Sequence, residues 1–430
     1  MNISDNTPEP QARIEIDSRV FNPFSPDFIR HPRETWQRLL REYPIAWHKE
    51  LQMWIVNSHE LCDKLLKNNQ FTPSYRAWEF APPEKSESEK NDFDRTFDHS
   101  LFVVSARDHL KLRKLTMPAF SKPVMGKIDA KIRDLVVECF DAIGDVAEFD
   151  VYEAIASKLP VRAIARMVGV PLGMEDFFHD FSVQVVKATR VNLSAKEREE
   201  AVQGTLPGLA YFKRTIAERR VAVHPGDDFI GSLVAASDGN DRLDDYDIMS
   251  IVLALITAGS DTATDLHTYA IHGLLSNPDQ YRLLQQRPEL MESAIIELLR
   301  WGSFGKVPFF RFATADAVVG GQLIKKGQAI GVNVSAAWHD PQKYQDWDRL
   351  DIQRNLAGNI VFGAGAHFCI GTFLVRVQGG LMISEFIKRF PNAELANGDG
   401  DLDYDYKHHN ARRIVRLRVN TNRKAQQRAA

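Results

Sequence analysis

The sequence predicts a mainly helical α+β fold, in which a large helical part is joined to a smaller strand-rich region. Two observations support this prediction. Long stretches between residues 124 and 300, and again at 370–390, carry apolar side chains at helical spacing. Short runs rich in β-branched and aromatic residues occur at 45–58 and 303–335, bounded by charged or glycine turns.

The N-terminal third contains one predicted hairpin and one predicted loop. Residues 1–18 are polar and acidic, and we expect them to form a flexible tail. The stretch "IAWHKELQMWIVNS" (45–58) predicts two short strands joined by a charged turn. Residues 81–98 are charged and contain two prolines, which is typical of a mobile surface loop.

Helices dominate the middle of the chain. Residues 124–144 predict a helix that ends at Gly144, and residues 197–221 predict helices interrupted near Pro207–Gly208. Residues 242–277 predict one long helix that begins with several aspartates and ends before Pro278. About 30 residues at 1.5 Å each would extend about 45 Å, which is enough to cross a globular domain.

Composition excludes several classes of protein. The formal net charge of −3 does not suggest a nucleic-acid binder. Three cysteines cannot all pair, so a disulfide scaffold is not expected. The N-terminus lacks the pattern of a signal peptide, and the most apolar run, 248–259, is too short to span a bilayer. We therefore expect a soluble, cytoplasmic protein without a membrane anchor.

One cysteine, Cys369, stands alone in the glycine-rich stretch "IVFGAGAHFCIG" (360–371). A nucleophile would need a base, and His367 is the only local candidate. A zinc site would need three or four ligands, whereas haem iron needs one axial protein ligand, which a thiolate can supply. A buried structural cysteine is the remaining reading. Because Cys369 has only His367 as a further possible ligand residue near it in the sequence, a haem site is favoured over the other three.

The surrounding glycines fit the same interpretation. Gly363 and Gly365 permit positive φ, so the backbone can turn tightly and lie against a flat ligand. A helix is predicted to begin at about Ile370, and its free N–H groups would stabilise an anionic sulfur on Cys369.

The stretch "FGAGAHFCIG" resembles the haem-thiolate signature F-G-x-G-x-H-x-C-x-G of the cytochrome P450 superfamily at every fixed position. The resemblance implies the cytochrome P450 fold as a single domain over residues 1–430. It also implies haem b, held between the long central helix and the cysteine loop. Cys369 would be the axial thiolate, and Phe362 and Ala258 would also contact the cofactor.

Other segments carry the same resemblance. "ELLR" supplies Glu297 and Arg300, which in the family form a buried network with a later arginine, here Arg354. "AGSDT" (258–262) lies within the long helix, where the Thr262 hydroxyl can bond back to the Ala258 carbonyl and, with Gly259, open the helix locally. In the family this notch lies over the iron.

Haem carries two propionate carboxylates that need cationic or hydrogen-bonding partners. His109 and Arg113 lie at i and i+4 of a predicted helix, Arg311 lies on a predicted strand, and His367 lies on the cysteine loop. By resemblance, all four occupy propionate-binding positions.

The resemblance implies a monooxygenation that uses O₂ and two electrons, with Asp261 and Thr262 delivering protons through water. No part of the chain resembles a reductase, so electrons would come from a separate ferredoxin or flavodoxin and its reductase. The substrate would be a mostly apolar small molecule that is hydroxylated or epoxidised, such as a polyketide- or peptide-derived metabolite or a terpenoid. A peroxide-using or rearranging enzyme and a non-catalytic haem sensor remain alternatives.

The resemblance to the family also predicts which residues line the substrate pocket and which form a surface for the redox partner. The loop 72–104 and the segment before Arg311 would line the substrate pocket, with two histidines entering from the far side: Trp78, Phe80, Phe97, Phe102, Val307, Phe309, His408 and His409. Lys111, Lys114 and Arg376 would form a basic docking patch. The chain departs from many relatives at Trp338–His339 and at Val375.

Overall fold

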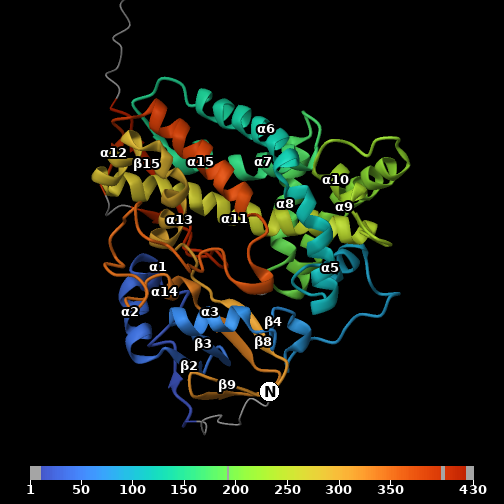
Figure 1. The fold of residues 1–430 in the computed structure, drawn as a ribbon, viewed down its shortest axis with the longest axis horizontal. Coiled ribbons are helices and arrows are strands. Elements are labelled where there is room, and N and C mark those ends of the chain that lie inside the picture. Colours follow the sequence, from blue (N-terminus) through green and yellow to red (C-terminus); the bar gives the residue numbers. More distant parts are fainter. Residues whose placement is uncertain (1–10, 191–192, 399–401, 423–430) are drawn as a thin grey trace, which may run out of the picture.

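The structure, a computed structural model, describes residues 11–190, 193–398 and 402–422. Its long helices fill the upper part of Figure 1 and its main sheet the lower part. The α-helices are α1 (Pro26–Arg30), α2 (Pro32–Glu42), α3 (His59–Lys67), α4 (Asp92–Asp98), α5 (Ala106–Thr116), α6 (Lys122–Asp141), α7 (Leu159–Val168), α8 (Glu175–Ala188), α9 (Ala195–Val221), α10 (Phe229–Ala235), α11 (Asp245–Ser276), α12 (Pro278–Gln286), α13 (Met291–Gly302), α14 (Val334–Ala337) and α15 (Thr372–Arg389).

Short helical turns and strands complete the fold. The turns are η1 (Tyr75–Ala77), η2 (Met117–Phe120), the π-helix η3 (Tyr152–Ala156), η4 (Pro288–Leu290) and η5 (Gly365–His367). The strands are β1 (Glu15–Ile16), β2 (Ile45–His48), β3 (Met53–Val56), β4 (Phe71–Thr72), β5 (Glu148–Asp150), β6 (Ser237–Asp238), β7 (Asp241–Arg242), β8 (Phe309–Ala313), β9 (Ala317–Val319), β10 (Gln322–Ile324), β11 (Ala329–Val332), β12 (Glu394–Leu395), β13 (Asp403–Tyr404), β14 (Ile414–Arg416) and β15 (Arg418–Asn420).

The main sheet joins the two strand-rich regions of the sequence. Within the described residues its order is β1-β2-β3-β11-β8-β4. The hairpin β2–β3 is antiparallel, with Trp47 opposite Trp54, and β3 pairs in parallel with β11 through Trp54 and Ile330. Strand β8, which carries Arg311, pairs with β11 and is thereby fixed against the N-terminal hairpin. The predicted hairpin and the predicted strand region at 303–335 are both confirmed.

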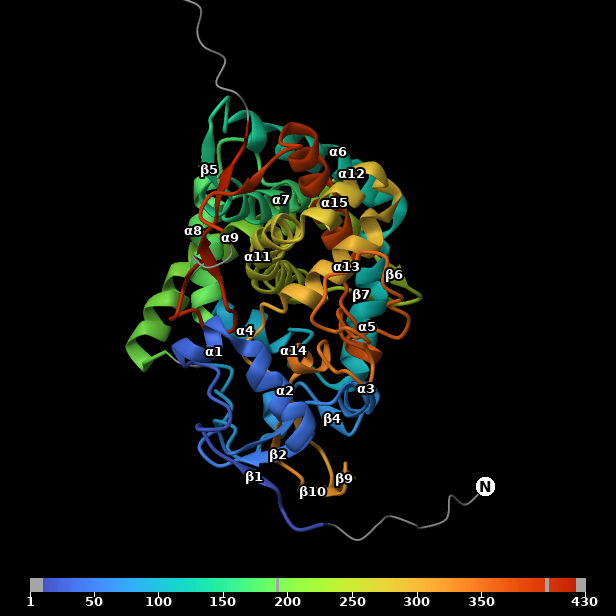
Figure 2. The ribbon, with the colours of Figure 1, turned by 90° about the vertical axis from the view of Figure 1, so that its left-hand side faces the viewer.

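The predicted long helix is confirmed as α11, which crosses the centre of the helical part. Asp244 caps it through a reciprocal pair of hydrogen bonds with Asp247, and Asn277 ends it before Pro278. Helices α7, α8, α9, α13 and α15 pack against it. Figure 2 views α11 almost end-on, between α7 and α8 on one side and α13 and α15 on the other. A residue on α11 can therefore face the middle of the molecule.

Three sequence predictions were wrong in detail. Helix α9 continues through Pro207, because Gly208 lets it pack closely on α8: a Cβ at Gly208 would lie 2.1 Å from the Phe181 ring. Residues 92–98, predicted as loop, form α4 behind a capping box made by Asn91 and Asp94.

The third prediction concerned the N-terminal tail. Glu15–Ile16 form β1, which pairs in parallel with β2, and Ile16 is buried. These two residues are therefore part of the sheet and do not belong to a flexible tail. Residues 1–10 of the predicted tail lie outside the described residues. In the described part of the chain, none of the helices combines the length and apolar character needed to cross a bilayer.

Candidate active site

The cysteine loop, residues 360–371, includes η5 and ends where α15 begins. Gly363 and Gly365 adopt φ of 75° and 69°, as predicted, and the Cys369 N–H donates to the Phe362 carbonyl at 2.9 Å. A Cβ at Gly365 would lie 2.6 Å from the Leu66 carbonyl oxygen, so the loop touches the end of α3 only because this residue is glycine. The loop is thus a tight, fixed turn that presents one thiol.

The Cys369 sulfur lies among groups that favour its anionic form, but burial works against them. Burial raises the pKa of the thiol above its ordinary value, although the Gly371 N–H, the Thr372 hydroxyl and Arg113 each lower it. We expected the start of the last helix to stabilise the thiolate. The structure shows that these groups contribute but do not outweigh burial. Cys62 and Cys139 are buried in the hydrophobic core.

The four predicted propionate partners come together from three separate segments. The His109 ring lies 4.0 Å from the His367 ring, centroid to centroid, and Arg113 donates to the Phe368 carbonyl at 2.6 Å. Burial, together with His109, Arg311 and Arg113, lowers the pKa of His367 to about 3, so all four groups are neighbours.

In the part of the chain that the structure describes, no acid pairs with the two arginines of this basic cluster, Arg113 and Arg311. Burial alone lowers the pKa of Arg311 to about 10. Buried cations without anions are costly unless a ligand supplies the charge, so this cluster fits a dianionic ligand such as the two carboxylates of haem.

Helix α11 exposes one face at its middle. Its residues from 263 to 275 are buried, as are most before 257, yet Ala258 and Thr262 are exposed one turn apart. The Thr262 hydroxyl donates to the Ala258 carbonyl at 2.5 Å, as predicted. The predicted local opening is not seen, because α11 is helical without a break across this stretch. The exposed face gives a flat ligand a place to lie against α11.

Asp261 does not stand free beside Thr262. Its Oδ1 accepts from Arg413 at 2.9 Å, and its Oδ2 lies 3.5 Å from Nε2 of His408. Burial alone would raise the pKa of Asp261, but His408 and Arg413 outweigh it and hold this pKa well below its usual range. Arg413 also contacts Asp265 at 3.0 Å.

Sequence reasoning missed Arg413 and Asp265. The separation of 148 to 152 residues leaves no local pattern that could link Arg413 to α11. The basic pair Arg412–Arg413 in a short strand-rich segment was the only signal, and it has no partner nearby in sequence. His408 was expected in the substrate pocket, and the structure places it against the acid residue of α11.

The buried network predicted around Glu297 is confirmed. Arg300 donates to both Glu297 oxygens at 2.7 and 2.8 Å, and Arg354 donates to Oε1 at 3.1 Å. Glu297 and Arg300 are fully buried. Arg300 also donates to the carbonyl of Trp338, one of the two unusual residues, while His339 stacks on Trp36 at 4.7 Å. This network ties α13 to the segment that precedes the cysteine loop.

The apolar side chains predicted to line a substrate pocket differ in exposure. Phe80, Phe102 and Phe309 are 59%, 49% and 48% exposed. Phe97 instead stacks on buried Phe93 with ring centroids 6.0 Å apart, so it belongs to the core at α4. Trp78 and Val307 are half-buried, and Trp78 contacts the Phe80 ring at 5.6 Å.

The three basic residues predicted to form a docking patch are each paired with an acid. Lys111 lies 3.9 Å from Asp241, Lys114 pairs with Asp238, and Arg376 pairs with Glu292. The hairpin β6–β7 thus brings two carboxylates to this surface. The patch is therefore less positive than the sequence implied.

Comparisons with known proteins agree with these features. The family model described as Cytochrome P450 matches residues 172–409. Epothilone C/D epoxidase of Sorangium cellulosum is 29% identical over 384 residues, 87% of this chain and 90% of the relative. Nocardicin C N-oxygenase of Nocardia uniformis subsp. tsuyamanensis is 30% identical over 347 residues, 80% and 83% of the two chains.

A polyketide biosynthesis cytochrome P450 of Bacillus subtilis strain 168, PksS, is 28% identical over 90% of this chain and 96% of the relative. The solved structure of epothilone B-bound cytochrome P450epoK superposes with a TM-score of 0.82 at 27% identity, covering 94% of this chain and all of that one. The chain therefore belongs to the cytochrome P450 family and is a haem-thiolate monooxygenase.

Proposed function

We propose that this monooxygenase hydroxylates or epoxidises a mostly apolar secondary metabolite, either polyketide- or peptide-derived or terpenoid, with electrons from a separate ferredoxin or flavodoxin. One observation carries the substrate class: the large apolar side chains Phe80, Phe102 and Phe309 are exposed. The His99 carbonyl accepts from Ser250 of α11 at 3.0 Å, so the segment that leads to Phe102 lies along this helix. Apolar surface of this kind favours an apolar ligand.

In this proposal Cys369 would supply the thiolate that binds the haem iron. His109, Arg113, Arg311 and His367 would hold the two propionates, which would supply the anions that this basic cluster lacks among the described residues. Ala258 and Phe362 would also contact the cofactor. Haem bound to a thiolate supplies O₂ activation and O–O cleavage.

Asp261 and Thr262 of this chain are the groups that would deliver the proton for the reaction. Thr262 holds a hydroxyl proton at Oγ1, within 2.5 Å of the Ala258 carbonyl and on the exposed face of α11. The neighbouring Asp261 stays ionised at neutral pH, because Arg413 and His408 stabilise its charged form. Asp261 would therefore orient water by accepting its hydrogen bonds, and that water, together with the Thr262 hydroxyl, would deliver the proton toward the substrate side.

The activities named for the relatives support the substrate class. One is an epothilone epoxidase and another is assigned to polyketide biosynthesis, while a third is an N-oxygenase of nocardicin C. Each name describes an oxygenation or a biosynthetic step on a secondary metabolite. We infer the same class for the present chain, which covers most of each relative.

The test is a ligand screen followed by turnover. Holoenzyme is mixed with panels of macrocyclic polyketides, peptide-derived metabolites, terpenoids and fatty acids, and the spin-state shift of the haem absorption is recorded. Hits are incubated with a surrogate ferredoxin, its reductase and NADPH, and products with one added oxygen atom are identified by mass spectrometry. Matched reactions lack the ferredoxin or contain hydrogen peroxide in its place.

We expect spin-state shifts from the secondary-metabolite panels and ferredoxin-dependent product. Shifts confined to fatty acids would contradict the substrate class. Product formed with peroxide alone, and not with the ferredoxin system, would instead identify a peroxide-using enzyme. Ligand binding without product under either condition would identify a haem-binding sensor.

A further inference from the structure

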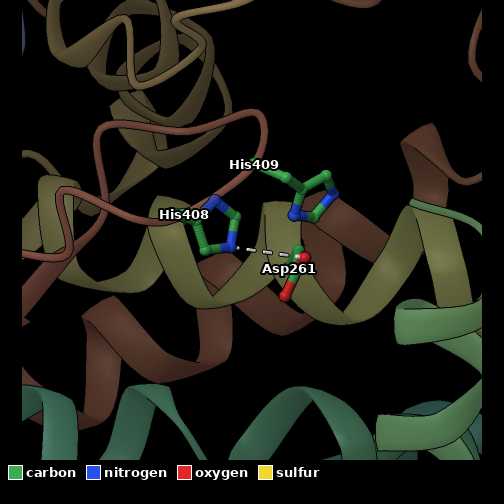
Figure 3. A group of neighbouring side chains, drawn as sticks. All are labelled: Asp261, His408 and His409. Atoms are coloured by element: carbon green, nitrogen blue, oxygen red, sulfur yellow. Dashed lines mark ion pairs between the residues drawn. The ribbon is translucent and has the colours of Figure 1, made fainter. Parts of the chain in front are cut away.

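His408 lies beside the acid residue of α11 although it belongs to the C-terminal strand region. The residue is 4% exposed, and its Nε2 lies 3.5 Å from Oδ2 of Asp261. Figure 3 shows the His408 ring turned toward this carboxylate, with His409 next to it on the same segment. The two imidazole rings are 4.8 Å apart, centroid to centroid.

The hydrogen bonds of His408 determine where its proton lies. The Ala411 N–H donates to Nδ1 at 3.1 Å, so Nδ1 offers its lone pair. In the neutral ring the proton must then be on Nε2. Nε2 is fully buried and has no hydrogen-bond partner among the described residues. A buried N–H without a partner is costly, and Oδ2 of Asp261 is an acceptor 3.5 Å away.

The two oxygens of Asp261 therefore have different partners. Arg413 donates to Oδ1 from 2.9 Å, and Nε2 of His408 lies 3.5 Å from Oδ2. Arg413 also donates to the backbone carbonyl of Asp261 at 3.1 Å and is held in turn by Asp265. One oxygen is thus fixed by an ion pair, and the other faces only the Nε2 edge of the His408 imidazole.

We propose that His408 is a positioning residue for Asp261: its Nε2–H holds Oδ2 and thereby sets the orientation of the carboxylate next to Thr262. This inference rests on the proposed role of Asp261 and Thr262 in proton delivery. His408 does not itself relay the proton, because a second proton on Nδ1 would meet the Ala411 N–H. Its contribution is to keep Asp261 ionised and correctly turned.

A metal site built from the same side chains fits the structure less well. Ligand atoms of Asp261, His408 and His409 lie within 4.8 Å of one another, which is close enough for an ion. A histidine that binds a metal through Nε2 normally donates its Nδ1–H to an acceptor. Here the Ala411 N–H donates to Nδ1 of His408, so Nδ1 is an acceptor and carries no proton to donate. The Asp261 carboxylate is also already paired with Arg413.

Other titratable groups also face this site and enter any pH dependence. They come from η3, the turn after α8, α11 and the C-terminal segment: Tyr152, Arg190, Asp265, Asp405, His409 and Arg413. Burial and then His408 lower the pKa of His409 to about 4, so His409 is neutral at pH 7. His409 is therefore a matched control. It is a histidine next to His408, but among the described residues no hydrogen bond fixes the position of its ring N–H relative to Asp261.

The first experiment measures the contact without turnover. A double-mutant cycle of His408→Gln or His408→Ala with Asp261→Asn is run on urea unfolding of the holoenzyme at pH 7, with His409→Ala as the control partner. We expect about tenfold coupling in the folding equilibrium for His408→Ala and little for His409→Ala. Coupling should diminish as pH falls far enough to protonate Asp261. Coupling absent for His408, or equal for the two histidines, would overturn the proposal.

The second experiment follows product formed per NADPH consumed as a function of pH. His408→Ala should reduce this yield, and its acid limb should move to higher pH by about one unit, because the ionised form of Asp261 has lost a hydrogen bond. His408→Gln retains an N–H donor and should restore the wild-type profile. A profile that stays at its wild-type position in His408→Ala would contradict the positioning role.

The two experiments distinguish the inference from the function on which it rests. If the cycle shows coupling but the wild-type enzyme makes no product, the proposed reaction fails while the His408–Asp261 contact stands. If product forms and the cycle shows no coupling, His408 is not a positioning residue and the proposed reaction stands.

Discussion

Arg413 bridges two carboxylates of the central helix, with its guanidinium 2.9 Å from Asp261 and 3.0 Å from Asp265. The two acids lie one turn apart on α11, and Arg413 comes from the segment next to β14, about 150 residues later in the chain. This contact fixes the C-terminal strand region against the middle of α11. It also places a structural ion pair directly beside the exposed face that carries Thr262.

Replacing Arg413 with methionine should lower the free energy of unfolding by about 3–5 kcal/mol at pH 7, because two buried carboxylates lose their cation. Burial already raises the pKa of Asp265, and a raised carboxyl pKa costs stability above the unfolded value of about 3.9. The loss should therefore shrink as pH falls and the acid takes up its proton. Urea unfolding at pH 7 and pH 5 measures both effects. Arg416→Met, at an exposed pair with Asp403, is the control and should change little. An equal loss in the two variants would contradict the bridging role.

Glu297→Gln should cost about 3–5 kcal/mol in the free energy of unfolding, because Arg300 would lose its charge partner while fully buried. The same variant should lose haem during purification, since Arg354 and the Asp351 N–H also depend on Glu297. The matched control is Glu292→Gln, which breaks the exposed pair with Arg376. Thermal unfolding measures the stability of each variant, and the haem-to-protein absorbance ratio measures its haem content. Equal losses of stability and haem in the two variants would show that the buried network around Glu297 does not stabilise the fold.

Gly365→Ala should be more damaging than Gly363→Ala. Both residues have positive φ, so alanine costs about 1–2 kcal/mol of backbone strain at each. Only at Gly365 does the new Cβ meet a backbone atom, 2.6 Å from the Leu66 oxygen, whereas at Gly363 the nearest atom is 3.8 Å away. Thermal unfolding of the two holoenzymes compares them, and equal destabilisation would contradict the tight contact between the cysteine loop and α3.

Arg311→Met should weaken haem retention while leaving the haem-free protein as stable as wild type or more so. The guanidinium is buried without a carboxylate partner among the described residues, so its charge helps only when an anionic ligand is present. The rate of haem transfer to an acceptor globin should rise about tenfold or more, in line with loss of a charge-assisted hydrogen bond. Arg311→Lys retains the cation, so its rate of haem transfer should lie between those of the wild type and Arg311→Met. Unchanged haem transfer in Arg311→Met would exclude this residue from propionate binding.

Thr262→Ala should divert reducing equivalents from product to hydrogen peroxide, since the exposed hydroxyl next to Asp261 would be lost. Thr262→Ser keeps the hydroxyl and should preserve most of the coupling. Peroxide and product are quantified per NADPH consumed with the surrogate ferredoxin system. If the alanine variant couples electrons to product as well as wild type does, Thr262 is not a proton donor.

Local patterns predicted much of the fold. The hairpin at 45–58 and the strands at 303–335 follow alternating apolar residues and glycine turns, and both are present. The ends of α11 follow from Asp244 as a cap and from Pro278, which cannot extend a helix. The contact between Glu297 and Arg300 was predictable because i and i+3 share a helix face.

The errors have physical causes that local patterns do not contain. Pro207 predicts a break in the helix, but packing of α9 on α8 outweighs one lost hydrogen bond and needs the missing side chain of Gly208. The charge of residues 92–98 predicts a loop, whereas buried Phe93 and Thr96 and the Asn91 cap make them a helix. The partners of Asp261 depend on a tertiary contact between α11 and the C-terminal segment, which no spacing in the sequence encodes.

The most direct measurement of the central claim, that Cys369 supplies the haem thiolate, is the absorption spectrum of the ferrous carbon monoxide complex. The wild-type protein and a Cys62→Ser/Cys139→Ser variant, in which Cys369 is the sole cysteine, should both show the strongly red-shifted band typical of thiolate ligation. Cys369→His should lose this band and show the spectrum typical of histidine ligation. A red-shifted band that persists in Cys369→His, or a wild-type spectrum typical of histidine ligation, would contradict the account.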